Sequence, residues 1–189
     1  MKLLVIFGAL PDPCLQAPGS GLLSQQNKSL AEGKVVSKCD LKKEFNNLPE
    51  SEWPEGHTMT DNFLAKLICH VEKASEFNTS AVNQLIPKKK EEEEAEQWTL
   101  YGLFQLSDHL ICSDGATPSP DRICNVTCSA LVDDHIEDDI SCVLNIARKV
   151  IDGGFAVERK REFWRMVKLI FQPDCNNETA GNYFAECKD

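Results

Sequence analysis

The densest group of chemically useful side chains is an acidic stretch between Cys128 and Cys142. Five carboxylates fall within seven residues there, at Asp133, Asp134, Glu137, Asp138 and Asp139. The macrodipole of a helix favours acidic residues in its first turn, which accounts for one or two of them. Five carboxylates held this close repel one another, and oxygen atoms are the ligands that calcium prefers. The stretch therefore predicts a calcium site.

The cysteines predict a disulfide framework. There are nine, at Cys14, Cys39, Cys69, Cys112, Cys124, Cys128, Cys142, Cys175 and Cys187. Cys14 falls in the N-terminal segment, and the remaining even number is typical of a small secreted protein. A zinc site is disfavoured, because Cys124 and Cys128 are the only close pair. The glycosylation sequons at Asn78, Asn125 and Asn177 fit a secretory route.

The N-terminal segment reads as a signal peptide. Lys2 precedes an apolar run over residues 3–10, which is the charge and hydropathy pattern of such segments. Small residues at Ala31 and Gly33 fit a cleavage before Lys34, whereas a cut after Ala17 lies closer to the apolar run. We therefore predict a signal or pro-segment over residues 1–33 and one domain over residues 34–189. The alternative is a buried N-terminal strand.

Composition excludes two classes of partner. The chain has 189 residues and a formal net charge of −10, so a nucleic-acid partner is not expected. It contains no apolar run of the length that a membrane-spanning helix needs, so no membrane span is expected. The charge block KKKEEEEAE at residues 88–96 is interpreted as a solvated loop.

Apolar periodicity predicts a mostly helical body with a small β-region. Leu41, Phe45 and Leu48 mark a first helix that ends at Pro49, and a polar loop over residues 49–58 follows. Thr60 or Asp61 caps a second helix. Its apolar face consists of Phe63, Leu64, Leu67, Ile68 and Val71. Residues 77–86 and 98–106 suit a β-hairpin. Further helices are expected over residues 140–151, ended by Gly153 and Gly154, and over residues 163–171, ended by Pro173. The apolar face of the last helix is expected to consist of Phe163, Trp164, Val167, Ile170 and Phe171.

Three short sequence segments and one cysteine spacing resemble those of the C-type lysozyme and α-lactalbumin family. Residues 34–39 (KVVSKC) resemble the mature N-terminus of these proteins, and residues 101–105 (YGLFQ) resemble one of their strands. Residues 128–142 (CSALVDDHIEDDISC) resemble the calcium elbow of α-lactalbumin. The spacing C-x11-C-x3-C-x13-C from Cys112 to Cys142 resembles the middle of the family's cysteine framework. The resemblance covers roughly residues 34–189.

The resemblance implies an α+β fold, with a mainly helical lobe, a small β-lobe and a cleft between them. It also implies four disulfides, Cys39–Cys187, Cys69–Cys175, Cys112–Cys128 and Cys124–Cys142.

The two carboxylates that enzymatic relatives use are absent. Their general acid is a Glu five residues after the second framework cysteine, where this chain has Ala74. Their second carboxylate precedes the Tyr-Gly strand, where this chain has Leu100, and Ile111 replaces a Trp of the substrate subsite. Glu72 and Glu76 lie two residues from Ala74, about 200° around a helix. Because a retaining glycosidase needs both carboxyl groups, hydrolysis is not expected.

The calcium ligands, in contrast, are all retained. The resemblance assigns the side chains of Asp133, Asp138 and Asp139 and the backbone carbonyls of Ala130 and His135. We interpret the His135 side chain as an ordinary loop histidine.

Two functions remain open. The first is a secreted, calcium-binding, non-enzymatic protein of α-lactalbumin type that binds an unknown protein or carbohydrate, with a galactosyltransferase as one candidate. The second is a lysozyme that hydrolyses β-1,4 bonds of peptidoglycan. The α-lactalbumin partner surface is only partly matched, because Glu72 and Lys73 replace its aromatic and histidine positions. Tyr183 and Phe184 precede Cys187 in the longer, lysozyme-type spacing.

Overall fold

The computed structural model describes residues 33–53, 60–86, 97–153 and 157–188, all within a compact unit over residues 31–189. The predicted signal segment up to residue 32, the charge block at 88–96, the second half of the 49–58 loop and Gly154 lie outside the described residues. No helix in the described ranges is long and apolar enough to cross a bilayer.

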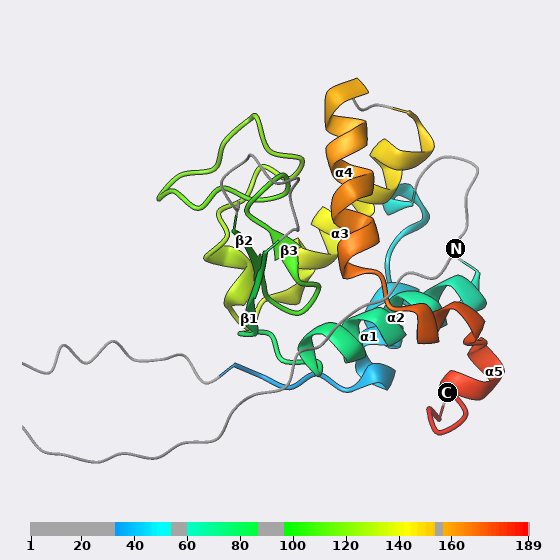
Figure 1. Ribbon diagram of the computed structural model, residues 1–189. Coiled ribbons are helices and arrows are strands. Elements are labelled where there is room, and N and C mark those ends of the chain that lie inside the picture. The colour runs from blue at the N-terminus through cyan, green and yellow to red at the C-terminus, as the bar shows by residue number, and fades with distance from the viewer. Residues whose placement is uncertain (1–32, 54–59, 87–96, 154–156, 189) are drawn as a thin grey trace, which may run out of the picture. The chain divides into compact units, whose positions relative to one another are not determined.

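Two of the helices begin at side-chain caps. Helix α1 (Lys38–Asn46) starts after Ser37, whose hydroxyl accepts a hydrogen bond from the Asp40 amide. Helix α2 (Asp61–Ser75) starts after Thr60, which accepts from the Phe63 amide in the same way, as the sequence predicted. Their apolar faces pack together with α5 (Ala180–Tyr183) in one core (Figure 1).

The predicted β-hairpin is present, and it continues into a third strand. Strands β1 (Val82–Leu85), β2 (Trp98–Tyr101) and β3 (Leu106–Ser107) form an antiparallel sheet in that order. The predicted strand over residues 98–106 is therefore broken in two. The break lies at Gly102, where φ is +71° and a Cβ atom would lie 1.6 Å from the Leu131 carbonyl oxygen. Only glycine fits such a contact, and it brings the sheet against the acidic loop.

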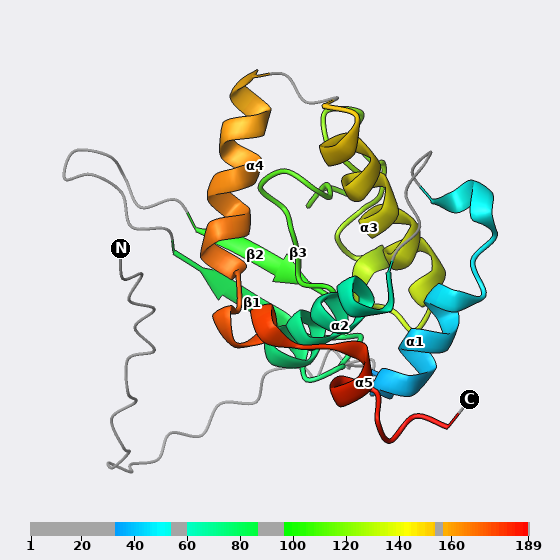
Figure 2. The same ribbon diagram turned by 90° about the vertical axis from the view of Figure 1, so that its right-hand side faces the viewer.

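A second core joins the sheet to the remaining long helices, α3 (Ile136–Ile151) and α4 (Val157–Ile170) (Figure 2). Helix α3 begins four residues before the predicted start at residue 140, because the acidic residues form its first turn. The predicted apolar face of α4 was partly wrong. Phe163 is buried as predicted, together with Met166, whereas Trp164 and Phe171, the latter just beyond the helix, are 43% and 41% exposed. Phe63, expected on the buried face of α2, is 54% exposed.

Three short 3-10 turns were not predicted, η1 (Glu50–Glu52), η2 (Ala130–Val132) and η3 (Pro173–Asn177). The first falls in the expected 49–58 loop. The third begins at Pro173, so the helix ends before that proline as expected.

The four disulfides join the pairs that the resemblance implied. They are Cys39–Cys187, Cys69–Cys175, Cys112–Cys128 and Cys124–Cys142. The first two close long loops and fasten the C-terminal segment to α1 and α2, whereas the other two hold both ends of the acidic loop.

Candidate functional site

The acidic stretch forms a turn, loop and helix start. Ala130 lies in η2, Asp133 and His135 in the loop, and Asp138 and Asp139 in the first turn of α3. Asp133 fixes the loop locally, because its Oδ1 accepts a hydrogen bond of 2.8 Å from the His135 amide. All five residues assigned to calcium therefore lie in one short segment.

Asp139 has the most unusual environment in this segment. It is 1% exposed, and neither of its carboxylate oxygens has a hydrogen-bond partner among the described residues. Burial raises the pKa of Asp139 to about 8, and the neighbouring charges of Asp138, Asp133 and Glu137 add to the effect. Burial also raises the pKa of Asp138, whose Oδ1 is likewise buried and unpaired. Buried carboxylates without a partner are costly, so the segment favours a bound cation.

The oxygen donors of this segment suit calcium, although their side chains are not arranged as a preformed metal site. In the part of the chain that the structure describes, no three His, Cys, Asp or Glu side chains are placed as a ready metal cluster. Asp138 and Asp139 would offer their unpaired oxygens, while one oxygen of Asp133 is already engaged by the His135 amide. When bound, calcium would supply positive charge to these carboxylates and order the loop against α3.

Ala74 and Leu100, the positions compared with the family's two carboxylates, are both linked to Asn83. Its side-chain amide donates to the Ala74 carbonyl at 3.4 Å, and Asn83 pairs with Leu100 across β1 and β2. The same amide donates to Gln105 Oε1 at 2.8 Å, and Gln105 in turn donates to the carbonyl of Gly102 at 2.8 Å. Amide and carbonyl groups thus link the end of α2 to the sheet through Asn83 and Gln105.

The two acidic neighbours of Ala74 along the chain have different surroundings. Glu72 accepts a hydrogen bond of 2.7 Å from the Tyr183 hydroxyl, on the side of α2 that meets α5. Burial, together with this hydrogen bond, raises the pKa of Tyr183. Glu76 is exposed and ends α2 with a left-handed backbone, at φ +52°.

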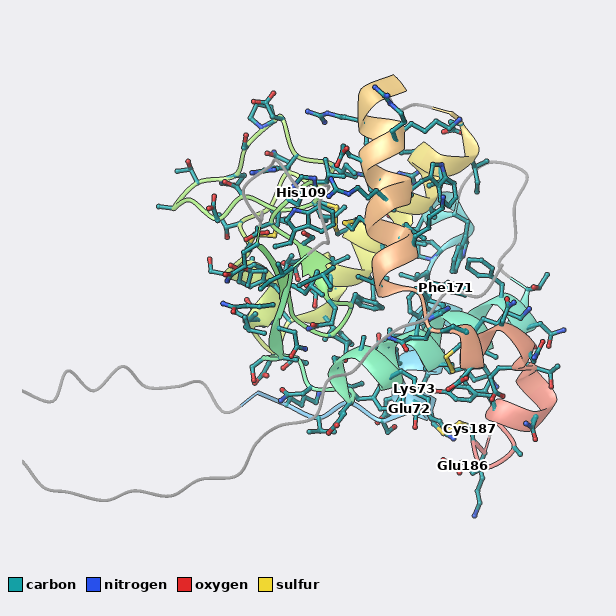
Figure 3. The ribbon with its side chains drawn as sticks, viewed as in Figure 1. Glu72, Lys73, His109, Phe171, Glu186 and Cys187 are labelled. Atoms are coloured by element: carbon teal, nitrogen blue, oxygen red, sulfur yellow. A yellow bond between two sulfur atoms is a disulfide. The ribbon has the colours of Figure 1, made fainter. Side chains whose placement is uncertain are left out.

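The aromatic residues before Cys187 do not form a surface. Tyr183 and Phe184 are 9% and 5% exposed and belong to the core around α2. Glu72, whose carboxylate accepts the hydrogen bond from Tyr183, and Lys73 both lie on α2 (Figure 3). The two aromatic residues before Cys187 are therefore buried.

Sequence reasoning missed a polar cluster that joins the sheet to α4. His109 stacks on the buried Trp98 with ring centroids 4.1 Å apart, and His109 Nε2 lies 3.3 Å from Glu162 Oε2. The Arg165 guanidinium lies over the Trp98 ring, with Cζ 5.3 Å from the ring centroid. Arg165 Nη1 donates to the same Glu162 oxygen at 3.4 Å. Figure 3 places His109 between the β-region and α4. The sequence carried no signal of this cluster, since its members are far apart along the chain.

The contacts of this cluster indicate a structural role. A histidine beside a carboxylate is a pairing that acid–base catalysis uses. Here, however, the Glu162 oxygen is shared with Arg165, and the His109 ring is packed against Trp98. The arrangement holds α4 against the sheet.

Three sequons lie in the described residues, and they differ in their surroundings. Asn125 and Asn177 are exposed. Asn78 is half-buried, and its Oδ1 accepts hydrogen bonds from both the amide and the hydroxyl of Ser80 at 3.0 Å.

Comparison with known proteins places this fold and these residues in a family. The model of the C-type lysozyme/alpha-lactalbumin family matches residues 34–163, and the chain belongs to this family. Lysozyme C-2 of Sus scrofa is 27% identical over 157 residues, covering 83% of this chain and 88% of the relative. Lysozyme C-1 of Sus scrofa is 26% identical over 155 residues, covering 82% of this chain and 99% of the relative.

Solved structures agree with this assignment. A calcium-binding lysozyme from equine milk is 28% identical, with a TM-score of 0.51, and covers 82% of this chain and 100% of that chain. The lysozyme of Equus asinus is 30% identical, with a TM-score of 0.50 and the same coverage.

Proposed function

We propose that this chain is a secreted, calcium-binding member of the family that does not hydrolyse glycosidic bonds and acts by binding a partner. The observation that carries the proposal is the pair Ala74 and Leu100, which are apolar at the two positions where the resemblance expects the carboxyl groups of a retaining glycosidase. Without an acid, the leaving oxygen is not protonated. Without a facing carboxylate, the developing positive charge on the sugar has no counter-charge.

The buried, unpaired carboxylate of Asp139 supports the calcium part of the proposal. The equine milk lysozyme, a calcium-binding protein, is a structural relative that supports it further. Four disulfides fit the oxidising conditions of the secretory route.

The partner is a protein or a carbohydrate. A galactosyltransferase is the candidate that the family suggests, and it is disfavoured by the charged residues Glu72 and Lys73 and by the buried Tyr183 and Phe184. The other candidate function, hydrolysis of peptidoglycan, is favoured only by the lysozyme relatives.

Clearing of a bacterial cell-wall suspension separates the two functions. The purified protein should not clear the suspension faster than buffer, whereas a lysozyme C assayed beside it should. The double variant Ala74→Glu, Leu100→Asp should gain at most a trace of activity, because Ile111 also departs from the substrate subsite. Turnover by the unmodified protein at a rate comparable with the lysozyme would refute the proposal.

A further inference from the structure

Helix α4 carries a large share of the protein's positive charge. Five of the chain's 20 Lys and Arg residues fall within its 14 residues, although the whole chain has a formal net charge of −10. Three of the five, Lys160, Arg161 and Lys168, are exposed. No acidic side chain among the described residues forms an ion pair with any of these three. An acidic protein therefore presents one basic helix, at the outside of the domain (Figure 2).

The three exposed cations share one face of α4 with an aromatic ring. At 100° per residue, four exposed side chains lie within about 100° of one another around the helix, those of Lys160, Arg161, Trp164 and Lys168. We call these four residues the basic face of α4. Phe163 and Met166 lie outside this sector and are buried. Glu162 also lies outside it, and its carboxylate is engaged by Arg165. The basic face thus contains no carboxylate, and it extends about 12 Å from the first lysine to the last.

Two partly exposed aromatic rings lie on or next to the basic face, and each contacts another ring of the protein. Trp164 is 43% exposed and its ring centroid is 5.6 Å from that of the buried Phe163. Phe171, at the end of α4, is 41% exposed and lies 5.1 Å from the His70 ring (Figure 3). A ring that the protein already holds loses little conformational freedom when a ligand stacks on it. The two rings therefore offer flat apolar surfaces beside the cations.

A linear polyanion fits the basic face better than an anionic membrane does. Interfacial helices insert an apolar face into the bilayer, whereas both rings here are less than half exposed and lie beside charged side chains. A flat anionic surface would also approach other, acidic parts of the protein within the screening length of about 8 Å. A narrow chain contacts only the helix face.

We propose that the basic face of α4 binds a sulfated polysaccharide. Sulfate groups pair with Lys160, Arg161 and Lys168, and sugar rings stack on Trp164. Sulfated polysaccharides are linear polyanions of the extracellular space, so this inference rests on the secretory route in the proposed function. It does not rest on the absence of hydrolysis, which the cell-wall assay tests separately.

Binding to heparin tests the proposal. The unmodified protein is titrated against heparin, against desulfated heparin, against single-stranded DNA and against phosphatidylglycerol vesicles, over a range of salt concentrations. One triple variant, Lys160→Gln, Arg161→Gln, Lys168→Gln, removes the charges of the basic face. The matched control, Lys43→Gln, Lys73→Gln, Lys188→Gln, removes three exposed lysines from other parts of the chain. Thermal melts establish that each variant is folded.

The unmodified protein should bind heparin at physiological ionic strength and should not bind desulfated heparin. The triple variant of the basic face should bind at least about tenfold more weakly, and with a shallower dependence on salt, because fewer counterions are released from the polyanion. The control triple variant should bind like the unmodified protein. Trp164→Ala should weaken binding without changing the salt dependence, since it removes a stacking surface but no charge.

Three results would overturn the proposal. The first is no binding of the unmodified protein to heparin. The second is an equal loss of binding in the two triple variants, which would mean that only the net charge matters. The third is tighter binding to single-stranded DNA or to the vesicles than to heparin.

Discussion

At the scale of single residues, Asp139 carries the strongest sign of a missing positive charge. Its carboxyl group is buried with both oxygens unpaired, at the start of a helix that already holds Asp138 and Glu137. A helix N-terminus stabilises a carboxylate near solvent by a few tenths of a kcal/mol to about 1 kcal/mol. That is too little to offset burial of a charge, so the helix alone does not explain this residue.

Calcium should therefore stabilise the protein through Asp138 and Asp139. At a free calcium concentration 100 times the dissociation constant, a ligand that binds only the folded state adds about 2.7 kcal/mol. For a body of this size that is about 5–11 °C in Tm. Asp139→Asn should abolish most of the shift and raise the Tm measured in chelator, because it removes a carboxyl group that is buried without a partner. Asp138→Asn should also reduce the shift.

Glu137→Gln is the matched control for that experiment. It removes an exposed charge from the same helical turn but no assigned ligand, so the calcium-dependent shift should be nearly unchanged. Identical melts of the unmodified protein in calcium and in chelator would mean that the acidic stretch binds no calcium.

The sequons make a second prediction at this scale. Asn125 and Asn177 are exposed, whereas the Asn78 side chain is held by Ser80 and its neighbour Thr79 is fully buried. We expect enzymatic deglycosylation of the secreted protein, followed by peptide mass spectrometry, to detect conversion to aspartate at Asn125 and Asn177 and not at Asn78. A glycan at Asn78 in the folded, secreted protein would contradict this.

At the scale of elements, the contact between α2 and the segment after α4 depends on a neutral histidine. The Gln172 amide donates to His70 Nδ1 at 3.2 Å, and the His70 ring lies 5.1 Å from the Phe171 ring. A protonated ring could not accept this bond. Burial lowers the pKa of His70 below its ordinary value of 6.5, in agreement with the geometry.

Acid should therefore weaken this contact. In the unfolded chain His70 takes up a proton near its ordinary pKa, while the folded protein resists protonation until a lower pH. The stabilising effect of neutral His70 is complete above pH 6.5 and is lost as the pH falls below it. Thermal melts between pH 8 and pH 5 should show a steeper loss of Tm for the unmodified protein than for His70→Gln, which stays neutral. Parallel curves would contradict the prediction.

At the scale of the whole molecule, the disulfides should differ in what they contribute. Cys69–Cys175 closes a loop with a sequence separation of 106, whereas Cys112–Cys128 closes one of 16. In the chain-entropy description the longer loop adds about 1.7 kcal/mol more to the free energy of unfolding. Replacing the first pair by alanine should therefore lower the urea midpoint more than replacing the second. The reverse order would show that the Cys112–Cys128 pair acts mainly through the native state of the acidic loop.

The sequence by itself determined the cysteine framework, the two apolar positions Ala74 and Leu100 and the composition of the acidic loop, because these depend on residue types and spacing. Apolar periodicity also located the helices and the hairpin, although it misjudged the exposed Phe63, Trp164 and Phe171. Apolar periodicity indicates which residues lie on the same face of a helix. It does not indicate how much of that face is covered by another element of the fold.

Only the tertiary structure decided which polar atoms meet across the chain. The stacking of His109 on Trp98 beside Glu162 depends on how α4 packs against the sheet. The loss of hydrogen-bond partners by Asp139 depends on burial, which follows from packing rather than from local sequence. The hydrogen bonds from the Lys34 amide to Thr79 and Asp134 join residues that are 45 and 100 positions apart. Contacts over such separations form only when the folded chain closes the loops between them.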